Sequence, residues 1–261
     1  MGALDGRVAL VTGIGAGMGT AIAAAYVAAG ATVVGVDIDD GAGRAVMDGL
    51  GGPEAGAHFL LGDVSSVEEC RGMVEAVVAD HGRIDVCVNN AGVTKSLGFF
   101  DVTPDDWDRI YSVNARGLFF CMQAAAVAMR DGGEGGRIVN IASIAGKGYR
   151  GTSNVAYAGT KGAVIAMTRI GAAQLARYDI RVNAICPGVT RTALFDQVID
   201  ELVERSGGTR EEAEARAVRS IPLRRANEPD DIAALAVYLA SDAARNVTGQ
   251  SWNVDGGLVF D

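Results

Sequence analysis

The chain has 261 residues, of which 36 are glycine, 4 cysteine and 2 histidine, and its formal net charge at pH 7 is −9. The acidic charge argues against nucleic acid and anionic membrane surfaces as partners, because both bind basic proteins. No apolar run approaches the roughly 20 residues of a membrane-spanning helix, and the scattered cysteines have no metal-ligand spacing. We therefore expect reduced, buried thiols, no metal site, no membrane association and a cytoplasmic location.

Short apolar runs rich in β-branched residues recur along the chain and predict strands that are buried on both faces. They lie at residues 8–11, 32–36, 58–61, 86–88, 137–141 and 181–186, with a last strand near 251–254. Segments of helical length separate them, and two of these segments open with capping-box spacing, Ser65 with Glu68 and Thr209 with Glu212. This alternation predicts one α/β domain spanning residues 1–261, with a doubly wound parallel sheet and helices on both of its faces.

A glycine-rich turn at residues 12–19 follows the first strand and reads Thr-Gly-Ile-Gly-Ala-Gly-Met-Gly. Glycines in such a turn let backbone amides approach a pyrophosphate at the amino end of the next helix, here residues 20–29. The second strand ends at Asp37, where a carboxylate can bridge ribose hydroxyls. The same carboxylate repels a 2′-phosphate, and neither Ala16 nor Ile38 offers a cation to hold one. The sequence therefore favours NAD over NADP, the alternative being that Asp37 is only a turn or cap residue.

Two long helices are predicted, over residues 105–130 and 155–178. The first opens with Thr103 as a cap and Pro104 at the first helical position. In the second, capped by Ser153 or Asn154, a phenol and an ammonium lie one turn apart on the same face.

Tyr157 and Lys161 have the spacing that places two helical side chains side by side. A free tyrosine titrates near pH 10, and a neighbouring cation favours the phenolate and lowers its pKa. Tyr157 is then able to exchange a proton with an alcohol or a ketone. Such a pair taken alone is more often part of a solvated helix surface.

The segment 190–222 departs from the alternation of strands and helices. It contains candidate helices at 195–205 and 210–219, and a further helix at about 230–241 follows it. An excursion after the carboxyl end of a strand lies where α/β sheets bind ligands. We interpret it as a helical substrate lid, the alternative being a solvated helical insertion.

Several motifs occur in order along the chain: the turn at 12–19, Asp63–Val64, Asn89–Asn90–Ala91–Gly92, Asn114, Ser143, Tyr157 with Lys161, Pro187–Gly188 with Thr192, and Asn253–Val254–Asp255–Gly256–Gly257. Together they resemble the short-chain dehydrogenase/reductase family in its single-domain form, over essentially the whole chain. The resemblance implies a Rossmann-type sheet of about seven strands in the order 3-2-1-4-5-6-7. It also implies a homotetramer assembled through the two long helices.

The resemblance assigns four catalytic residues. Tyr157 is the expected general acid/base, Ser143 the hydrogen-bond partner of the substrate oxygen, and Lys161 the residue that also holds the nicotinamide ribose. Asn114 is expected to position a water that links Lys161 to solvent.

The resemblance also assigns the cofactor site. Asp63 and Val64 are expected at the adenine, Asn90 at the ribose, and Thr192 at the nicotinamide amide. The full set of expected cofactor residues is Gly13, Gly17, Met18, Gly19, Asp37, Ile38, Asp63, Val64, Asn90, Ala91, Gly92, Ile141, Tyr157, Lys161, Pro187, Gly188 and Thr192.

These assignments predict an NAD(H)-dependent oxidoreductase that interconverts a small-molecule secondary alcohol and a ketone. One alternative is an NADPH-dependent 3-ketoacyl-thioester reductase acting on an acyl carrier protein, with Lys147, Arg150 and Arg191 as basic residues at its entrance. Another is a non-catalytic dinucleotide-binding sensor. The loop between Ser143 and Tyr157 is one residue longer than is common in the family, and its Tyr149 and Arg150 either face the substrate or are solvated.

Overall fold

The structure is a computed structural model that describes residues 2–260. Within one helix, α7 (Ala193–Ser206), it leaves the side chains of Leu194, Gln197, Val198, Glu201, Arg205 and Ser206 outside the description. Along the described chain, no helix is both long enough and apolar enough to cross a membrane.

Seven parallel strands form one sheet in the order β3-β2-β1-β4-β5-β6-β7, which confirms the predicted order. The strands are β1 (Val8–Thr12), β2 (Thr32–Asp37), β3 (Ala57–Leu61), β4 (Val86–Asn89), β5 (Gly136–Ile141), β6 (Ile180–Pro187) and β7 (Ser251–Val254). Because β1 pairs with both β2 and β4, the strand order reverses beside β1. Ligands of open α/β sheets bind at such a reversal, at the carboxyl ends of the strands.

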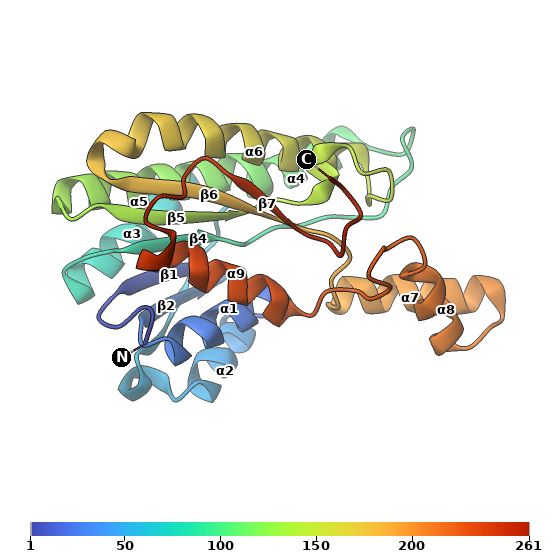
Figure 1. Ribbon diagram of the computed structural model, residues 1–261, viewed down its shortest axis with the longest axis horizontal. Coiled ribbons are helices and arrows are strands. Elements are labelled where there is room, and N and C mark those ends of the chain that lie inside the picture. The colour runs from blue at the N-terminus through green and yellow to red at the C-terminus, as the bar shows by residue number, and fades with distance from the viewer. Residues whose placement is uncertain (1, 261) are drawn as a thin grey trace.

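Helices cover both faces of the sheet (Figure 1). They are α1 (Gly17–Ala28), α2 (Asp40–Gly49), α3 (Val67–His81), α4 (Pro104–Tyr111), α5 (Leu118–Gly132), α6 (Val155–Leu175), α7, α8 (Arg210–Ala217) and α9 (Pro229–Ala240). One apolar core lies between the sheet and the face formed by α1, α2 and α9. A second core lies on the other face, beneath α3 and α5. Apolar runs along the strands therefore serve two cores at once.

Strand β3 corrects one prediction. Burial on both faces was expected, but only Ala57 is fully buried and Leu61 is 53 % exposed. The strand lies at the edge of the sheet and pairs only with β2 on its inner side. An edge position leaves part of the strand in contact with solvent even in a parallel sheet.

The helix predicted over 105–130 is interrupted. The capping box of Thr103 and Asp106 opens α4 as expected, but a π-helical turn at Ser112–Gly117 separates α4 from α5. A β-carbon on Gly117 would come within 2.2 Å of the carbonyl oxygen of Val64. The chain therefore passes very close to the end of β3 at this turn, and the turn carries Asn114.

The capping box predicted at Ser65 and Glu68 lies one residue too early. Ser66 caps α3 and its side chain accepts a hydrogen bond from the Glu69 amide. Ser65 is already engaged, because its amide and its hydroxyl both donate to the Asp63 carboxylate at 2.8 Å. The capping box of Thr209 and Glu212, in contrast, is present as predicted and opens α8.

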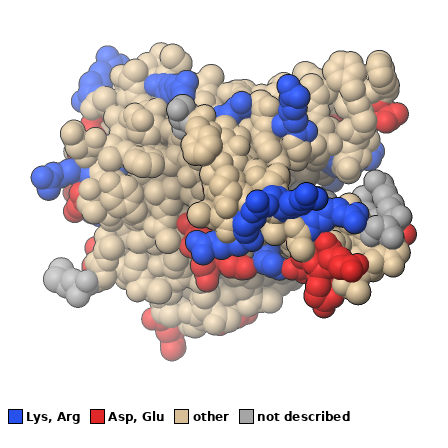
Figure 2. Space-filling view, turned by 45° about the vertical axis from the view of Figure 1, so that its right-hand side comes forward, with Lys and Arg blue, Asp and Glu red and all other residues tan. Residues whose placement is uncertain are grey.

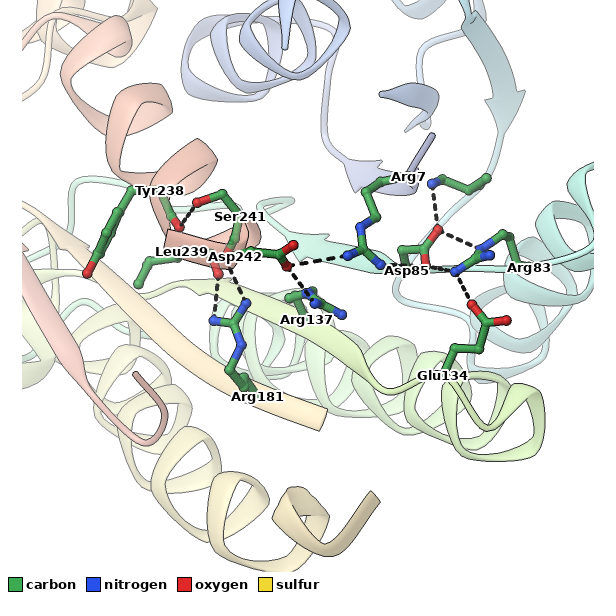
Figure 3. Close-up of polar contacts among 11 residues, drawn as sticks. Arg7, Arg83, Asp85, Glu134, Arg137, Arg181, Tyr238, Leu239, Ser241 and Asp242 are labelled. Atoms are coloured by element: carbon green, nitrogen blue, oxygen red, sulfur yellow. Dashed lines mark hydrogen bonds and ion pairs between the residues drawn. The ribbon is translucent and has the colours of Figure 1, made fainter. Parts of the chain in front are cut away.

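The amino ends of the central strands are joined by an ion-pair network on the edge opposite the carboxyl ends (Figure 3). Buried Asp85 accepts from the Val8 amide at 2.8 Å and from Arg83 Nε at 2.9 Å. Arg7 and Arg137 both pair with Asp242, which follows α9. These contacts tie β1, β4, β5 and the end of α9 together, away from any ligand-binding edge.

Helices α7 and α8 project beyond the carboxyl end of the sheet (Figure 1). They pack on each other through a small apolar cluster built around Phe195, Ile199 and Ala213. Arg210 at the start of α8 pairs with Asp196, Asp200 and Glu214. The helical excursion predicted at 190–222 is therefore present, held by one small core and exposed ion pairs.

Candidate active site

The turn after β1 is built for close approach of backbone to backbone. A β-carbon on Gly19 would lie 1.9 Å from the Gly13 carbonyl oxygen, and one on Gly13 would lie 2.7 Å from the Ala91 α-carbon. Gly13 also has a φ of +71°, which favours glycine. No larger residue fits at either position, so the turn keeps the amino end of α1 open toward a ligand.

Side chains from β1 and β4 lock this turn in place. Thr12 Oγ1 accepts hydrogen bonds from the Asn90 and Ala91 amides, each at 3.1 Å. The Asn90 amide Nδ2 donates to the carbonyl oxygens of Thr12 at 3.0 Å and Gly13 at 2.9 Å. Asn90 therefore shapes the turn directly. This hydrogen-bonding role was not assigned to Thr12 from the sequence, although Thr12 is the first residue of the glycine motif.

Asp37 also secures the turn. Its Oδ2 accepts from the Gly15 amide at 2.7 Å and its Oδ1 from the Asp39 amide at 2.9 Å. The turn-residue interpretation of Asp37 is thus present in the structure. Asp37 also lines the adjacent cleft, so the turn contacts leave it next to the space expected for a cofactor.

That cleft has a volume of about 380 Å³ and lies at the carboxyl ends of β1, β2 and β4. Twelve of the expected cofactor residues line it: Gly13, Gly17, Met18, Gly19, Asp37, Ile38, Asp63, Val64, Asn90, Ala91, Gly92 and Thr192. Residues from the turn after β1 to the start of α7 thus meet around one space. A glycine cradle that any β-carbon would fill is what a dinucleotide requires, and these residues fit the group.

The remaining expected residues do not line this cleft, although Lys161 lies next to Gly92, which does. The Gly188 amide donates to Val254 at 2.8 Å, and a β-carbon on Gly188 would lie 2.7 Å from the Asp255 side chain. Pro187 ends β6 directly before it. Ile141 ends β5, and its carbonyl oxygen accepts from Lys161 Nζ at 2.7 Å.

Three side chains meet beside this cleft. Ser143 follows β5, and its side chain acts on Tyr157 to lower the pKa of the phenol. Lys161 Nζ lies 5.6 Å from the centre of the Tyr157 ring. Serine, tyrosine and lysine, from two different elements, therefore form one cluster.

Asn154 fixes the start of α6, which carries two of the three. Its Oδ1 accepts from the Tyr157 amide at 2.7 Å, and its Nδ2 donates to the Lys95 carbonyl at 2.7 Å. Of the two caps considered, the structure uses Asn154. Gly146 is a further positioning residue that the sequence did not reveal, because a β-carbon there would lie 2.5 Å from the Lys161 backbone.

The electrostatics of the cluster differ from the sequence prediction. Burial raises the pKa of Tyr157, and the hydrogen bond with Ser143 acts in the opposite direction. Burial lowers the pKa of Lys161 to about 8. The prediction that Lys161 lowers the pKa of Tyr157 is therefore wrong for this structure. The lysine turns its ammonium group to the Ile141 carbonyl, and loss of water around the phenol outweighs the rest.

Asn114 lies fully buried in the π-helical turn. Its Oδ1 accepts from the Val93 amide and its Nδ2 donates to the Val93 carbonyl, both at 2.8 Å. A β-carbon on Gly92 would lie 3.4 Å from Asn114 Oδ1 and 3.6 Å from Lys161 Nζ. The structure thus brings Asn114 next to Lys161 across Gly92. π-Helical turns are frequent at functional sites.

The basic residues considered for a carrier-protein entrance are mostly engaged within the protein. Lys147 Nζ donates to the Ser251 carbonyl at 2.9 Å. Arg191 pairs with Glu214 at 2.9 Å and with Glu228 at 3.1 Å. Arg150 is exposed, and Tyr149 packs against an apolar cluster that includes Ile144.

Comparison with known proteins identifies the family to which the chain belongs. A family model described as enoyl-(acyl carrier protein) reductase matches residues 13–259. The chain belongs to the short-chain dehydrogenase/reductase family. Members of this family are oxidoreductases that use NAD or NADP and act on small molecules.

Relatives in the family differ in substrate. The chain is 36 % identical over 255 residues to sorbitol dehydrogenase of Cereibacter sphaeroides, covering 97 % of this chain and 98 % of that protein. It is 39 % identical over 258 residues to acetoacetyl-CoA reductase of Shinella zoogloeoides, covering 97 % and 99 %. A crystal structure of 3-ketoacyl-(acyl-carrier-protein) reductase from Brucella melitensis complexed with NADH is similar with a TM-score of 0.87 and 32 % identity, covering 98 % and 100 %.

Proposed function

We propose that this protein is an NAD(H)-dependent short-chain dehydrogenase/reductase that interconverts a secondary alcohol and a ketone, with Tyr157 as general acid/base. The observation that carries the proposal is the cluster of Ser143, Tyr157 and Lys161, with Lys161 Nζ 5.6 Å from the centre of the Tyr157 ring and next to Gly92, which lines a cleft shaped for a dinucleotide. A module that only senses a dinucleotide has no need of this cluster.

The cluster is suited to moving a proton. Ser143 holds the substrate oxygen, and Tyr157 takes the hydroxyl proton during oxidation or returns it to the carbonyl oxygen during reduction. NAD, when bound, would supply the hydride chemistry at the carbinol carbon, as acceptor in oxidation and as NADH in reduction. Lys161 positions the tyrosine and the ribose, and Asn114 positions a water next to it.

The raised pKa of Tyr157 has a directional consequence. The phenol is protonated at neutral pH, which suits donation of a proton to a ketone. Oxidation needs the phenolate, so the rate of alcohol oxidation should increase as the pH rises above neutral.

Asp37 supports the choice of NAD. Its carboxylate borders the cleft, and the next residue, Ile38, is apolar and 68 % exposed, so it offers no charge to a 2′-phosphate. We propose that the cofactor is bound by all seventeen residues that the family resemblance assigns to it, from Gly13 to Thr192. Relatives that are named for sorbitol or galactitol dehydrogenation support a hydroxylated small molecule as substrate.

Assembly and the lid belong to the same proposal. We assign the homotetramer to α5 and α6, which border an apolar groove of about 540 Å³ in which Ile170 is 61 % exposed. We treat the chain as one cytoplasmic domain in which α7 and α8 close over the substrate.

The test is steady-state kinetics with a panel of polyols and other secondary alcohols, in NAD and in NADP. Wild type should prefer NAD. Tyr157→Phe should lose about 10²–10⁴-fold in kcat while its dissociation constant for NADH, measured by fluorescence, stays within about twofold. Asp37→Ala should relax the preference for NAD.

Near-wild-type turnover by Tyr157→Phe would remove the proposed mechanism. An unchanged cofactor preference in Asp37→Ala would remove the NAD assignment and leave the proton transfer intact. A panel in which no alcohol or ketone reacts would return the protein to the class of non-catalytic sensors.

A further inference from the structure

Four arginines at and after the end of α8 are exposed: Arg216, Arg219, Arg224 and Arg225, here called the arginine ridge. Among the side chains that the structure describes, no carboxylate pairs with any of them. Arg191 and Arg210, in the same excursion, each pair with at least two carboxylates. Figure 2 shows Lys and Arg side chains gathered in a band on the face where α7 and α8 come forward, with Asp and Glu side chains beside it. Four exposed arginines without a paired carboxylate in the described part of the molecule are unusual in a chain of net charge −9.

The ridge lies at the carboxyl edge of the sheet, beside the candidate active site. The Leu223 amide donates to the Gly256 carbonyl at 3.1 Å, directly after β7. The Asn227 amide donates to the Val189 carbonyl at 2.8 Å, and the Arg191 amide donates back to Asn227 at 2.9 Å. The segment that carries the ridge is therefore bonded to the chain between Gly188 and Thr192, which we assign to the nicotinamide (Figure 1).

Arg224 gives an independent reason to assign a role to this segment. Its φ is +55°, in the left-handed region, where a residue with a β-carbon is strained and glycine is not. Its guanidinium group also donates to the main-chain carbonyl oxygen of Arg219, which places the Arg224 side chain against the backbone of another ridge residue. Strain of this kind tends to occur at ligand-binding sites.

We propose that the arginine ridge binds a phosphate group that the substrate carries at a distance from its reacting carbon. The inference rests on the proposed function and narrows its substrate class to phosphate-bearing alcohols and ketones. Guanidinium groups donate paired hydrogen bonds to phosphate oxygens, a geometry that lysine does not reproduce. The phosphates of the cofactor are assigned to the glycine turn, so the ridge is available to a second anion.

Two kinds of small molecule carry such a group, and matched pairs of substrates separate them. D-Sorbitol 6-phosphate is compared with D-sorbitol, and acetoacetyl-CoA with the acetoacetyl thioester of N-acetylcysteamine, which lacks the nucleotide. Each pair presents the same reacting group with and without phosphate. We expect the KM of the phosphorylated member of at least one pair to be about tenfold lower or more, and to rise with added NaCl because salt screens exposed charges.

The decisive variants are Arg219→Gln/Arg225→Gln and Arg224→Gly, the second of which suits the backbone at that position. Both should raise the KM of the phosphorylated substrate about tenfold, with kcat and the KM of its neutral partner within about twofold. The matched control is Arg71→Gln/Arg245→Gln, which removes two exposed arginines on α3 and after α9. Its KM values should equal those of wild type, and NADH affinity should be the same in all four proteins.

Other outcomes would overturn the inference. If both members of each pair react with equal KM, the proposed function stands and the ridge has no phosphate to bind. If the ridge variants weaken NADH binding, the ridge is part of the cofactor site. If activity requires the acyl group on a carrier protein, the ridge recognises a macromolecule. If none of the four compounds reacts with NAD or NADH, the proposed function fails, and the inference fails with it.

Discussion

The two sides of the candidate site, the proposed cofactor side around the glycine turn and the proposed substrate side at α7 and α8, are built in different ways. On the cofactor side, buried or half-buried groups from β1, β2 and β4 hold the glycine turn through short hydrogen bonds between side chain and backbone. On the substrate side, α7 and α8 are held by one small apolar cluster and by ion pairs between exposed side chains.

This difference separates what must be rigid from what can vary. Buried hydrogen bonds are costly to break because the groups left behind find no water. Exposed ion pairs contribute little and are screened by salt. The cofactor side is thus preformed, whereas the substrate side can be rebuilt by changing surface residues. Relatives that share this fold but are named for polyols or for acetoacetyl-CoA are consistent with that division.

The largest effect is expected from a single methyl group on the cofactor side. Gly19→Ala places a β-carbon 1.9 Å from the Gly13 carbonyl oxygen and 2.6 Å from Asn90 Nδ2, so α1 or the turn must shift. We expect a loss of about 1–3 kcal/mol in the free energy of unfolding and an NADH dissociation constant raised more than about tenfold. Urea unfolding and fluorescence titration measure the two quantities.

The matched control is Gly72→Ala on α3, where nothing lies within 4 Å of the added β-carbon. Alanine should stabilise this helix by up to about 1 kcal/mol and leave NADH binding unchanged. Equal effects of the two substitutions on NADH affinity would show that the turn is not the rigid side of the site.

A smaller effect is expected from the pH response of a buried charge. Burial lowers the pKa of Lys161 from 10.5 to about 8. Below pH 8 the side chain is protonated in both the folded and the unfolded state. Between about pH 8 and 10.5 it is protonated only in the unfolded state. The unfolded state then binds more protons, so this group makes wild type more stable as the pH rises through that window.

Comparison with Lys161→Met isolates the contribution. The unfolding free energy of wild type minus that of the variant should increase by up to about 1.4 kcal/mol per pH unit above pH 8. Urea unfolding between pH 7 and 9.5, at one protein concentration, measures it, with Lys95→Met as the control because Lys95 is exposed. A difference that is flat across this range would contradict the burial of the ammonium group.

The same contrast explains which features the sequence could predict. The glycine turn and the spacing of Tyr157 and Lys161 depend on local patterns, whereas the strand order was implied by the family resemblance. The structure has that order and brings Tyr157 and Lys161 together. The start of α3 and the break before α5 depend on side chains that bind backbone elsewhere. Asp63 engages Ser65, and Asn114 binds the backbone of Val93, which no periodicity reveals.

The pKa shifts and ion pairs of the site could not be predicted from the sequence for a related reason. The sequence places Lys161 beside Tyr157 but does not show that the ammonium group bonds to Ile141 or that folding removes water from both groups. In the same way, Lys147 and Arg191 look like entrance residues in the sequence, yet each is engaged within the protein. Whether a charge is neutralised depends on the partner that folding brings, and that partner is distant in the chain.

The smallest effect is expected on the substrate side. Arg210→Gln removes the cation shared by Asp196, Asp200 and Glu214, all of it at the surface. Exposed ion pairs contribute little to global stability, so Tm should change by no more than about 2 °C. Hydrogen exchange in α7 and α8 should nevertheless accelerate about fivefold, while exchange in β1 and α1 stays the same. In 1 M NaCl the exchange rates of wild type in α7 and α8 should approach those of the variant, because salt screens these charges.

Equal acceleration on both sides of the cleft would mean that α7 and α8 are held as firmly as the glycine turn. The division between a rigid cofactor side and an adjustable substrate side would then not hold.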